Sequence, residues 1–183
     1  MSYCYSALLP GLDAIRLLRL LPHDNEDAPL QCQLFNCTIQ DSGRRTHPYA
    51  ALSYVWGETD NPKSISINDH NLTVTVNLYG ALSRLRHTSI ERVLWVDAIC
   101  INQNDTFEKE QQIRIMAKIY ALASQVVVWL GDAADNSDQA LEEIRLVGSH
   151  ENSSNSSSLN ITQQDAILEL LRRPWFRRIW VRG

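Results

Sequence analysis

Residues 93–101 read Val-Leu-Trp-Val-Asp-Ala-Ile-Cys-Ile, and this stretch decides the fold. Asp97 carries its only charge, and every other side chain in it is apolar. Such near-continuous hydrophobicity is typical of a strand that is covered on both faces, as the strands of parallel sheets are. We therefore predict a buried central strand over residues 93–101.

Segments with strand and helix patterns flank this central strand. The segment before it is rich in β-forming residues and ends at Trp56-Gly57, and the buried-type strand after it is ended by Gly131. Between the strands, Asp105 begins a helix with apolar residues at helical spacing. Parallel neighbours need such crossover connections, so the order predicts an α/β domain with a mainly parallel central sheet and flanking helices. The flanking strands cover residues 49–55 and 125–130, and the helix covers residues 105–123.

The outer parts of the chain predict further elements. Asn77 is expected to cap one helix, and Thr162 is expected to cap another, which Pro174 ends. An apolar run at residues 15–21 precedes a strand at 30–39, and a small β-hairpin lies within 64–76. Helices are expected at 77–85, 138–147 and 162–171, and a final strand is expected at 177–182.

Length and composition are those of one ordinary soluble domain. The chain has 183 residues, of which 44% are apolar and 21% are charged, and this size is sufficient to bury a core. Its 17 basic and 21 acidic residues leave a formal charge of -4, which gives no general attraction to nucleic acid or anionic lipid. We predict one domain over residues 1–183 with no nucleic-acid partner, and a flexible Ser/Asn-rich loop at 149–160.

The sequence lacks the signals of membrane spans, secretion and metal binding. Its apolar stretches are far shorter than the roughly 18 residues of a spanning helix, and Pro10 and Asp13 interrupt the apolar amino-terminal segment. Its cysteines form no C-x-x-C pair, its histidines lie far apart, and the common nucleotide and hydrolase motifs are missing. We therefore expect a cytoplasmic chain with no metal site and no firmly implied cofactor.

Three blocks of sequence, in order, carry a family resemblance. The first, residues 49–57, reads Tyr-Ala-Ala-Leu-Ser-Tyr-Val-Trp-Gly. The second, residues 94–103, reads Leu-Trp-Val-Asp-Ala-Ile-Cys-Ile-Asn-Gln, and a Glu108, Gln112, Met116 pattern leads from it to Val-Trp-Leu-Gly at 128–131. The third, residues 174–181, reads Pro-Trp-Phe-Arg-Arg-Ile-Trp-Val. Together they closely resemble the fungal heterokaryon incompatibility (HET) domain, over about the whole chain.

This resemblance implies a cytoplasmic effector of filamentous fungi that triggers regulated cell death when incompatible cells fuse. It implies self-association into a homo-oligomer, or partners among other HET and nucleotide-binding receptor proteins. HET domains are likened to TIR domains, which implies a TIR-like, flavodoxin-like fold and makes NAD a candidate substrate. Family members typically continue after Trp-Val with Gln-Glu and more helices, whereas this sequence closes with Arg182-Gly183, so we expect a domain that is truncated at its carboxyl end.

Glu108 is the candidate catalytic residue. A carboxylate just past the central strand suits the glutamate of a TIR-like mechanism, which stabilises the cationic transition state of glycosidic cleavage. The same residue, three positions after Asp105, also fits a capping box, which is a structural role. Gln112 lies one helical turn further on the same face and is a candidate ligand contact, although such a residue is most often solvated.

Asp97 is the second candidate. An unpaired buried carboxylate costs several kcal/mol, so Asp97 needs backbone N–H groups, a hydroxyl or a base such as Arg177 or Arg178 as its partner. It serves either as a structural anchor or as a ligand-facing group. Cys100 is expected to be a buried small hydrophobic residue, because nothing nearby supplies the base that a nucleophile needs.

The end of the first strand supplies the remaining candidates for a ligand pocket. The Trp56 ring can stack on a nicotinamide or adenine, and Gly57 lets the backbone approach closely. Alternatively, Trp56 fills the end of the core and Gly57 makes a turn. Ser53 and Tyr54 complete this candidate pocket, whereas Trp95, Trp129, Trp175 and Trp180 are expected in the core.

Two alternatives to a catalytic effector remain at this stage. One is a non-catalytic signalling module that acts by self-assembly alone. The other is an inactive, truncated relative that regulates full-length partners.

Overall fold

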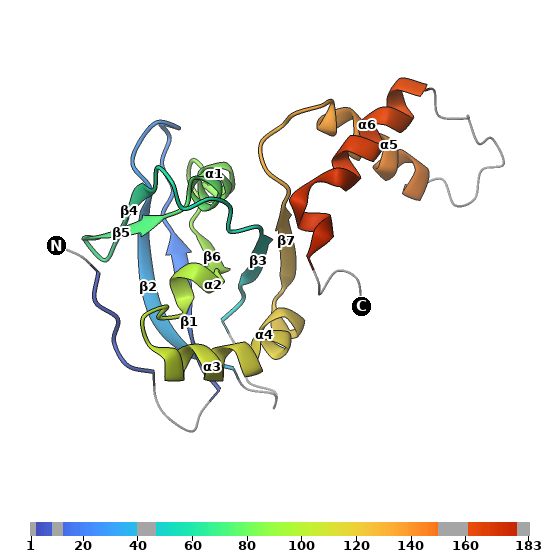
Figure 1. The fold of residues 1–183 in the computed structure, drawn as a ribbon. Coiled ribbons are helices and arrows are strands. Elements are labelled where there is room, and N and C mark those ends of the chain that lie inside the picture. The colour runs from blue at the N-terminus through green and yellow to red at the C-terminus, as the bar shows by residue number, and fades with distance from the viewer. Residues whose placement is uncertain (1–2, 9–12, 40–46, 150–160, 179–183) are drawn as a thin grey trace. The chain divides into compact units, whose positions relative to one another are not determined.

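The computed structural model describes residues 3–8, 13–39, 47–149 and 161–178. The chain forms two compact units, which meet in sequence between Trp129 and Leu130. The first contains a seven-stranded sheet and helices α1 to α4, and the second contains helices α5 and α6 and a short 3-10 helix (Figure 1).

The sheet of the first unit is mixed, with order β5-β4-β2-β1-β6-β3-β7. Strands β6, β3 and β7 run parallel to one another, β1 joins β6 and β2 in antiparallel fashion, β2 pairs with β4 in parallel, and β4 and β5 form the predicted hairpin. The prediction of an α/β fold is confirmed. The strands are β1 (Ala14–Leu20), β2 (Gln31–Thr38), β3 (Ala50–Tyr54), β4 (Lys63–Ile67), β5 (His70–Val74), β6 (Arg92–Trp95) and β7 (Gln125–Trp129).

The helices join and cover the strands. The prediction that Asn77 caps α1 is wrong. The cap is Thr75, two residues earlier, whose Oγ1 atom accepts the N–H of Leu78 at 3.3 Å. The helices are α1 (Val76–Leu85), α2 (Asp97–Cys100), α3 (Thr106–Arg114), α4 (Met116–Leu122), α5 (Ser137–Ser149) and α6 (Ile161–Arg172), followed by the 3-10 helix Pro174–Arg177.

The central apolar stretch is a strand only in its first part, so the prediction of one strand over residues 93–101 is wrong. β6 ends at Trp95, and the N–H groups of Ile99 and Cys100 then donate to the carbonyl oxygen of Val96 at 3.0 and 2.7 Å. An apolar run does not by itself distinguish a buried strand from a buried helical turn. Asp97 consequently lies in the first turn of α2 and not inside a strand.

The predicted helix over residues 105–123 is divided into α3 and α4 at Ile115, whose φ and ψ are -98° and 4°. No glycine or proline stands at this break. The two halves have different tertiary partners, because the Gln112 amide donates to the Ala14 carbonyl at 2.8 Å and the Tyr49 hydroxyl donates to the Ile119 carbonyl at 2.6 Å. The local sequence does not predict the break between α3 and α4, but the two helices make different tertiary contacts on either side of it.

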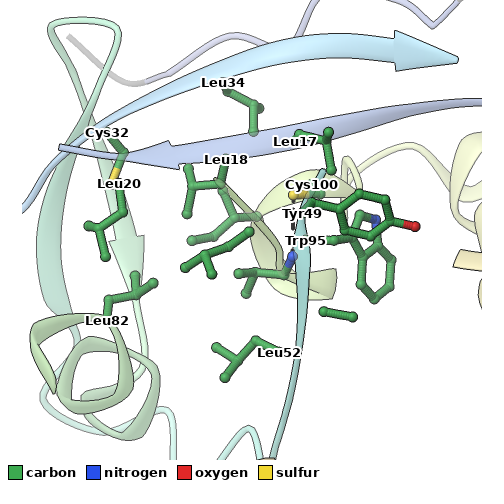
Figure 2. Packing of buried hydrophobic residues seen from close by; sticks show 14 of the residues in the cluster. Leu17, Leu18, Leu20, Cys32, Leu34, Tyr49, Leu52, Leu82, Trp95 and Cys100 are labelled. Carbon is green, nitrogen blue, oxygen red and sulfur yellow. Dashed lines mark hydrogen bonds between the residues drawn. The ribbon is translucent and has the colours of Figure 1, made fainter. Parts of the chain in front are cut away.

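One apolar core holds the first unit together. In Figure 2, Leu82 of α1 points toward Leu20 of β1 and Cys32 of β2, while Tyr49, Trp95 and Cys100 lie together at another part of the core. Leu78, Ala81 and Leu82 supply the buried stripe of α1, at the helical spacing that the sequence predicts.

β7 is an edge strand of the sheet that the structure describes, and the exposure of its side chains corrects the expectation of a buried strand. Val126 and Val128 are 49% and 39% exposed, and β3 is the one described strand that pairs with β7. Val127, which points to the opposite face, is packed against the core.

The second unit has its own small core, in which Ala140 of α5 meets Ala166 and Leu170 of α6. Thr162 lies inside α6 and does not cap it, because the helix begins at Ile161. Arg177 ends the 3-10 helix where a strand was predicted, and residues 179–182 of that strand lie outside the described residues, as does the expected loop at 150–160. Among the helices that the structure describes, none is long and apolar enough to cross a membrane.

Candidate functional site

The parallel strands β3, β6 and β7 end at one edge of the sheet, which we call the carboxyl edge. Trp56, two residues beyond β3, donates its indole N–H to Oδ2 of Asp97 at 3.0 Å. The other carboxylate oxygen of Asp97 accepts the N–H of Ala98 at 2.8 Å. Trp56 is 42% exposed, and its indole lies beside the Asp97 carboxylate at the surface. Ligands of open α/β sheets bind at edges of this kind.

Gly57 and Asn77 shape the turn that carries Trp56. The side-chain amide of Asn77 donates to the Val55 carbonyl, and its oxygen accepts the indole N–H of Trp129 at 2.8 Å. Gly57 has a φ of 74°, and a Cβ atom at this residue would lie 3.2 Å from Cβ of Asn77. Glycine is therefore favoured at this position both by the backbone conformation and by the neighbouring side chain.

A bidentate ion pair between Arg16 of β1 and Glu108 of α3 forms a second polar cluster. The two Nη atoms of Arg16 donate to the two carboxylate oxygens of Glu108 at 2.6 and 2.9 Å. Arg16 also donates to the carbonyl of Cys100 at 3.2 Å and to that of Ser6. The Arg16 side chain is 1% exposed and that of Glu108 is 11% exposed, so water screens this pair little.

Of the two hydrogen bonds in the predicted capping box, the one from Glu108 N–H to the Asp105 side chain is present, and the one from Asp105 N–H to the Glu108 side chain is not. Oδ1 of Asp105 accepts the N–H of Glu108 at 3.0 Å, so Asp105 caps α3 as predicted. The Glu108 carboxylate accepts the N–H of Asn102 at 2.7 Å, and it makes no bond to the N–H of Asp105. Glu108 thus ties the loop before α3 to the buried arginine.

Tyr5 covers the buried arginine from the amino-terminal segment. Its ring centre lies 5.0 Å from the guanidinium carbon of Arg16, and its hydroxyl donates to the Ile99 carbonyl at 3.0 Å. Burial, with a smaller contribution from Cys100, raises the pKa of Tyr5 to about 12, and the Arg16 charge opposes the shift. The hydroxyl therefore stays a hydrogen-bond donor at neutral pH.

The predicted site residues fall into two groups. Trp56, Gly57 and Asp97 come together at the carboxyl edge, whereas Glu108 and Gln112 contact β1 from α3. Within the described residues, no hydrogen bond or ion pair joins Glu108 to Asp97 or Trp56. Ser53, Tyr54 and Gln112 are buried, so the expectation of a solvated Gln112 is wrong.

The predictions for Cys100 and the tryptophans have different outcomes. Cys100 is fully buried, as predicted, and burial raises the pKa of its thiol to about 12. Trp95 belongs to the core, whereas Trp129 and Trp175 are half-buried and Trp180 lies outside the described residues. The alternative in which Trp56 fills the end of the core does not agree with its exposure.

Arg16 and Asn77 belong to these clusters but are missing from the sequence-based candidates. Arg16 stands in a strand that is apolar at five of its seven positions. A buried charge needs a partner, so Arg16 could have been identified on the same grounds as Asp97. Asn77 carries no such signal, because an asparagine near a helix start is ordinarily a cap. Among the described residues, no group of three or more His, Cys, Asp or Glu side chains has an arrangement that could hold a metal ion.

Comparison with known proteins identifies a matching protein family. Residues 49–182 match the family described as heterokaryon incompatibility protein (HET). The chain belongs to this family. The HET match contains Trp56, Asp97 and Glu108, while Arg16 precedes it.

A curated relative of this HET domain is heterokaryon incompatibility protein 6, OR allele, of Neurospora crassa. The two are 38% identical over 160 residues, which cover 80% of this chain. The aligned part is 23% of the length of the relative, so the HET domain corresponds to under a quarter of that protein. No solved structure matches the chain.

Proposed function

We propose that this HET domain is an effector of nonself recognition in a filamentous fungus, and that its activation triggers regulated cell death. The observation that carries the proposal is the match to the heterokaryon incompatibility family over residues 49–182, together with the 38% identity to a heterokaryon incompatibility protein. Within the cell we expect it to be cytoplasmic, and to act with copies of itself or with other HET or nucleotide-binding receptor proteins.

Inducible expression of residues 1–183 in a filamentous fungus tests this proposal. We expect growth arrest and uptake of a dye that intact cells exclude. The Gly57→Val variant is a suitable control, since strain at a positive φ should unfold the turn and abolish the response. Normal growth of cells that accumulate the folded wild-type chain would contradict the proposal.

NAD hydrolysis is the candidate chemistry for this effector. The observation in its favour is the carboxyl edge, where the exposed Trp56 ring offers a stacking surface beside the Asp97 carboxylate. Water would replace nicotinamide at the ribose carbon, with ADP-ribose as the other product. Glu108 is the catalytic carboxylate in this proposal, and Ser53, Tyr54, Gly57 and Gln112 are the proposed ligand contacts. For this role Glu108 must exchange its bond to Arg16 for one to a ribose hydroxyl.

Nicotinamide release from NAD by concentrated protein tests this chemistry. If the carboxyl edge binds NAD, Trp56→Ala should raise KM while Glu108→Gln lowers kcat. Because Glu108→Gln also removes the partner of Arg16, its free energy of unfolding has to be measured beside its activity. Nicotinamide release no faster than in a protein-free blank, from protein that kills cells, would exclude the enzymatic proposal.

The second candidate function is signalling by self-assembly without catalysis. Its specific support is that both Glu108 oxygens are already bonded to Arg16 and that one also accepts the Asn102 N–H, an arrangement that serves the fold. On this proposal Glu108→Gln variants that remain folded keep their toxicity, and toxicity follows oligomer formation measured by light scattering.

A further inference from the structure

A cavity lies at the edge of the sheet opposite to the carboxyl edge. Its volume is about 430 Å³, and Ala50, Arg92 and Gln125 in its wall stand at the beginnings of β3, β6 and β7. These strands are parallel, so this cavity is separate from the Trp56 and Asp97 surface at their other ends. Its volume is within the range of small-molecule sites.

Arg92 provides a free positive charge in the wall of this cavity. The guanidinium is exposed, and it makes no hydrogen bond or ion pair with any residue of the described part of the chain. The neighbouring Glu91 carboxylate lies 3.3 Å from Nε of Arg19. None of the described residues that line the cavity is acidic. The wall is therefore locally positive although the whole chain has a net charge of -4.

His87 adds a neutral donor whose tautomer follows from its contacts. The backbone N–H groups of Ser89 and Ile90 donate to its Nδ1 at 3.1 and 3.2 Å. Backbone amides only donate, so Nδ1 must be an acceptor, and the proton of the neutral ring resides on Nε2. Nε2–H has no partner among the residues that the structure describes.

Gln125 and the apolar wall complete the site. The side-chain amide of Gln125 makes no hydrogen bond within the described residues, so its N–H₂ group remains available as a donor. The Ser124 hydroxyl is occupied as a donor, since it bonds the Tyr49 carbonyl at 2.7 Å. Ile90 and Val93 line the same cavity with apolar surface.

We propose that this cavity binds a small organic anion that carries a phosphate or carboxylate group. The Arg92 guanidinium contacts the anionic group, and its planar fork suits both phosphate and carboxylate. His87 Nε2–H and the Gln125 amide are the additional donors. Ile90 and Val93 contact the organic part of the ligand, which an inorganic anion lacks.

Two-dimensional ¹⁵N–¹H NMR of the full chain tests the proposal with three probes: inorganic phosphate, AMP and benzoate. We expect saturable shifts at residues 86–94 and 124–125 with AMP, benzoate or both, and the stronger of the two identifies a phosphate or a carboxylate ligand. The Arg92→Gln substitution should raise the Kd of that ligand about tenfold or more, the size expected for losing a charge-assisted hydrogen bond.

Arg84→Gln is the matched control, because it removes the same charge from an exposed arginine of α1 that does not line the cavity. Its Kd should stay within about twofold of the wild-type value, well under 1 kcal/mol. The proposal is overturned if no probe gives saturable shifts up to about 10 mM. It is also overturned if Arg92→Gln binds as tightly as the wild type, or if inorganic phosphate binds as tightly as both organic probes. The spectra themselves report whether each variant is folded.

Discussion

Arg16 and Glu108 show how a single contact changes the interpretation of a candidate catalytic residue. The carboxylate is held by two arginine nitrogens and by one backbone amide, and the arginine is almost completely buried. Removing one member of such a pair leaves an uncompensated buried charge, which costs far more than an exposed pair contributes. Loss of activity on mutating Glu108 is therefore meaningful only beside a measurement of stability.

We expect Glu108→Ala to lower the free energy of unfolding by about 3 kcal/mol, because Arg16 remains buried without its partner. The Arg16→Met and Glu108→Leu double variant should be more stable than the sum of its single variants predicts, since it removes both charges. Urea unfolding of the wild type, Arg16→Met, Glu108→Leu and the double variant measures this coupling. Additive effects of the two substitutions would show that the pair contributes little.

At the scale of secondary-structure elements, the structure differs from the sequence-based prediction mainly at the junctions between elements. β6 changes into α2 after Trp95, β3 ends in the turn at Gly57, and α3 gives way to α4 at Ile115. Hydrophobic pattern and β propensity predict where apolar segments lie. β2, β3 and β7 follow the predicted strands closely, and β1 coincides with the apolar run at 15–21, for which no strand is predicted. They do not predict where an apolar segment changes direction, because that depends on which neighbours its ends contact.

The turn after β3 makes a testable element of this kind. Gly57→Ala should lower the free energy of unfolding by about 1 to 2 kcal/mol, because alanine is strained at a φ of 74° and its Cβ would crowd Asn77. Gly148→Ala is the matched control, since a Cβ there meets none of the described residues within 4 Å, and it should be neutral or stabilising. Denaturant midpoints measure both. Equal effects of the two substitutions would contradict this account of the turn.

At the scale of the whole molecule, the two units have separate apolar cores. The buried core residues of the first unit all come from residues 15–119, and those of the second are Ala140, Ala166 and Leu170. A core that is complete within one segment allows that segment to fold alone. Whether residues 1–183 behave as the single predicted domain is therefore an experimental question about cooperativity.

We expect an isolated chain of residues 1–129 to unfold cooperatively, because it contains the whole sheet and its core. Near-UV circular dichroism of the buried Trp95 should persist in it, and its urea transition should have one step. A fragment without near-UV signal or without a cooperative transition would show that the first unit depends on residues 130–183.

The whole molecule should also lose stability in alkaline solution. Burial raises the pKa of Cys32, Cys100, Tyr5 and Tyr49 to about 12 in the folded state, from ordinary values of 9.0 for the thiols and 10.0 for the phenols. Between about pH 9 and pH 12 the unfolded chain therefore holds fewer protons than the folded one, and the free energy of unfolding falls as pH rises. Below pH 9 this contribution is fully present.

Urea unfolding at a series of pH values measures this slope. Tyr49→Phe is the informative variant, because it removes one phenol whose pKa is raised. At neutral pH it should be less stable than the wild type, because it loses the hydrogen bond to the Ile119 carbonyl. Its free energy of unfolding should nevertheless fall less steeply as the pH rises above 9. A stability that does not change between pH 9 and pH 11 would contradict the raised pKa values.

The sequence by itself determined the class of fold, the family and most of the segments, because apolar periodicity and the motif blocks at 49–57 and 94–103 are local properties of the chain. It also indicated that Asp97 needs a partner and that Cys100 is buried. Only the tertiary structure decided that the partners are the Trp56 indole and the Ala98 amide, that Glu108 belongs to Arg16, and that Val126 and Val128 are exposed. These outcomes depend on strand order and on contacts between residues up to 92 positions apart, which no local pattern encodes.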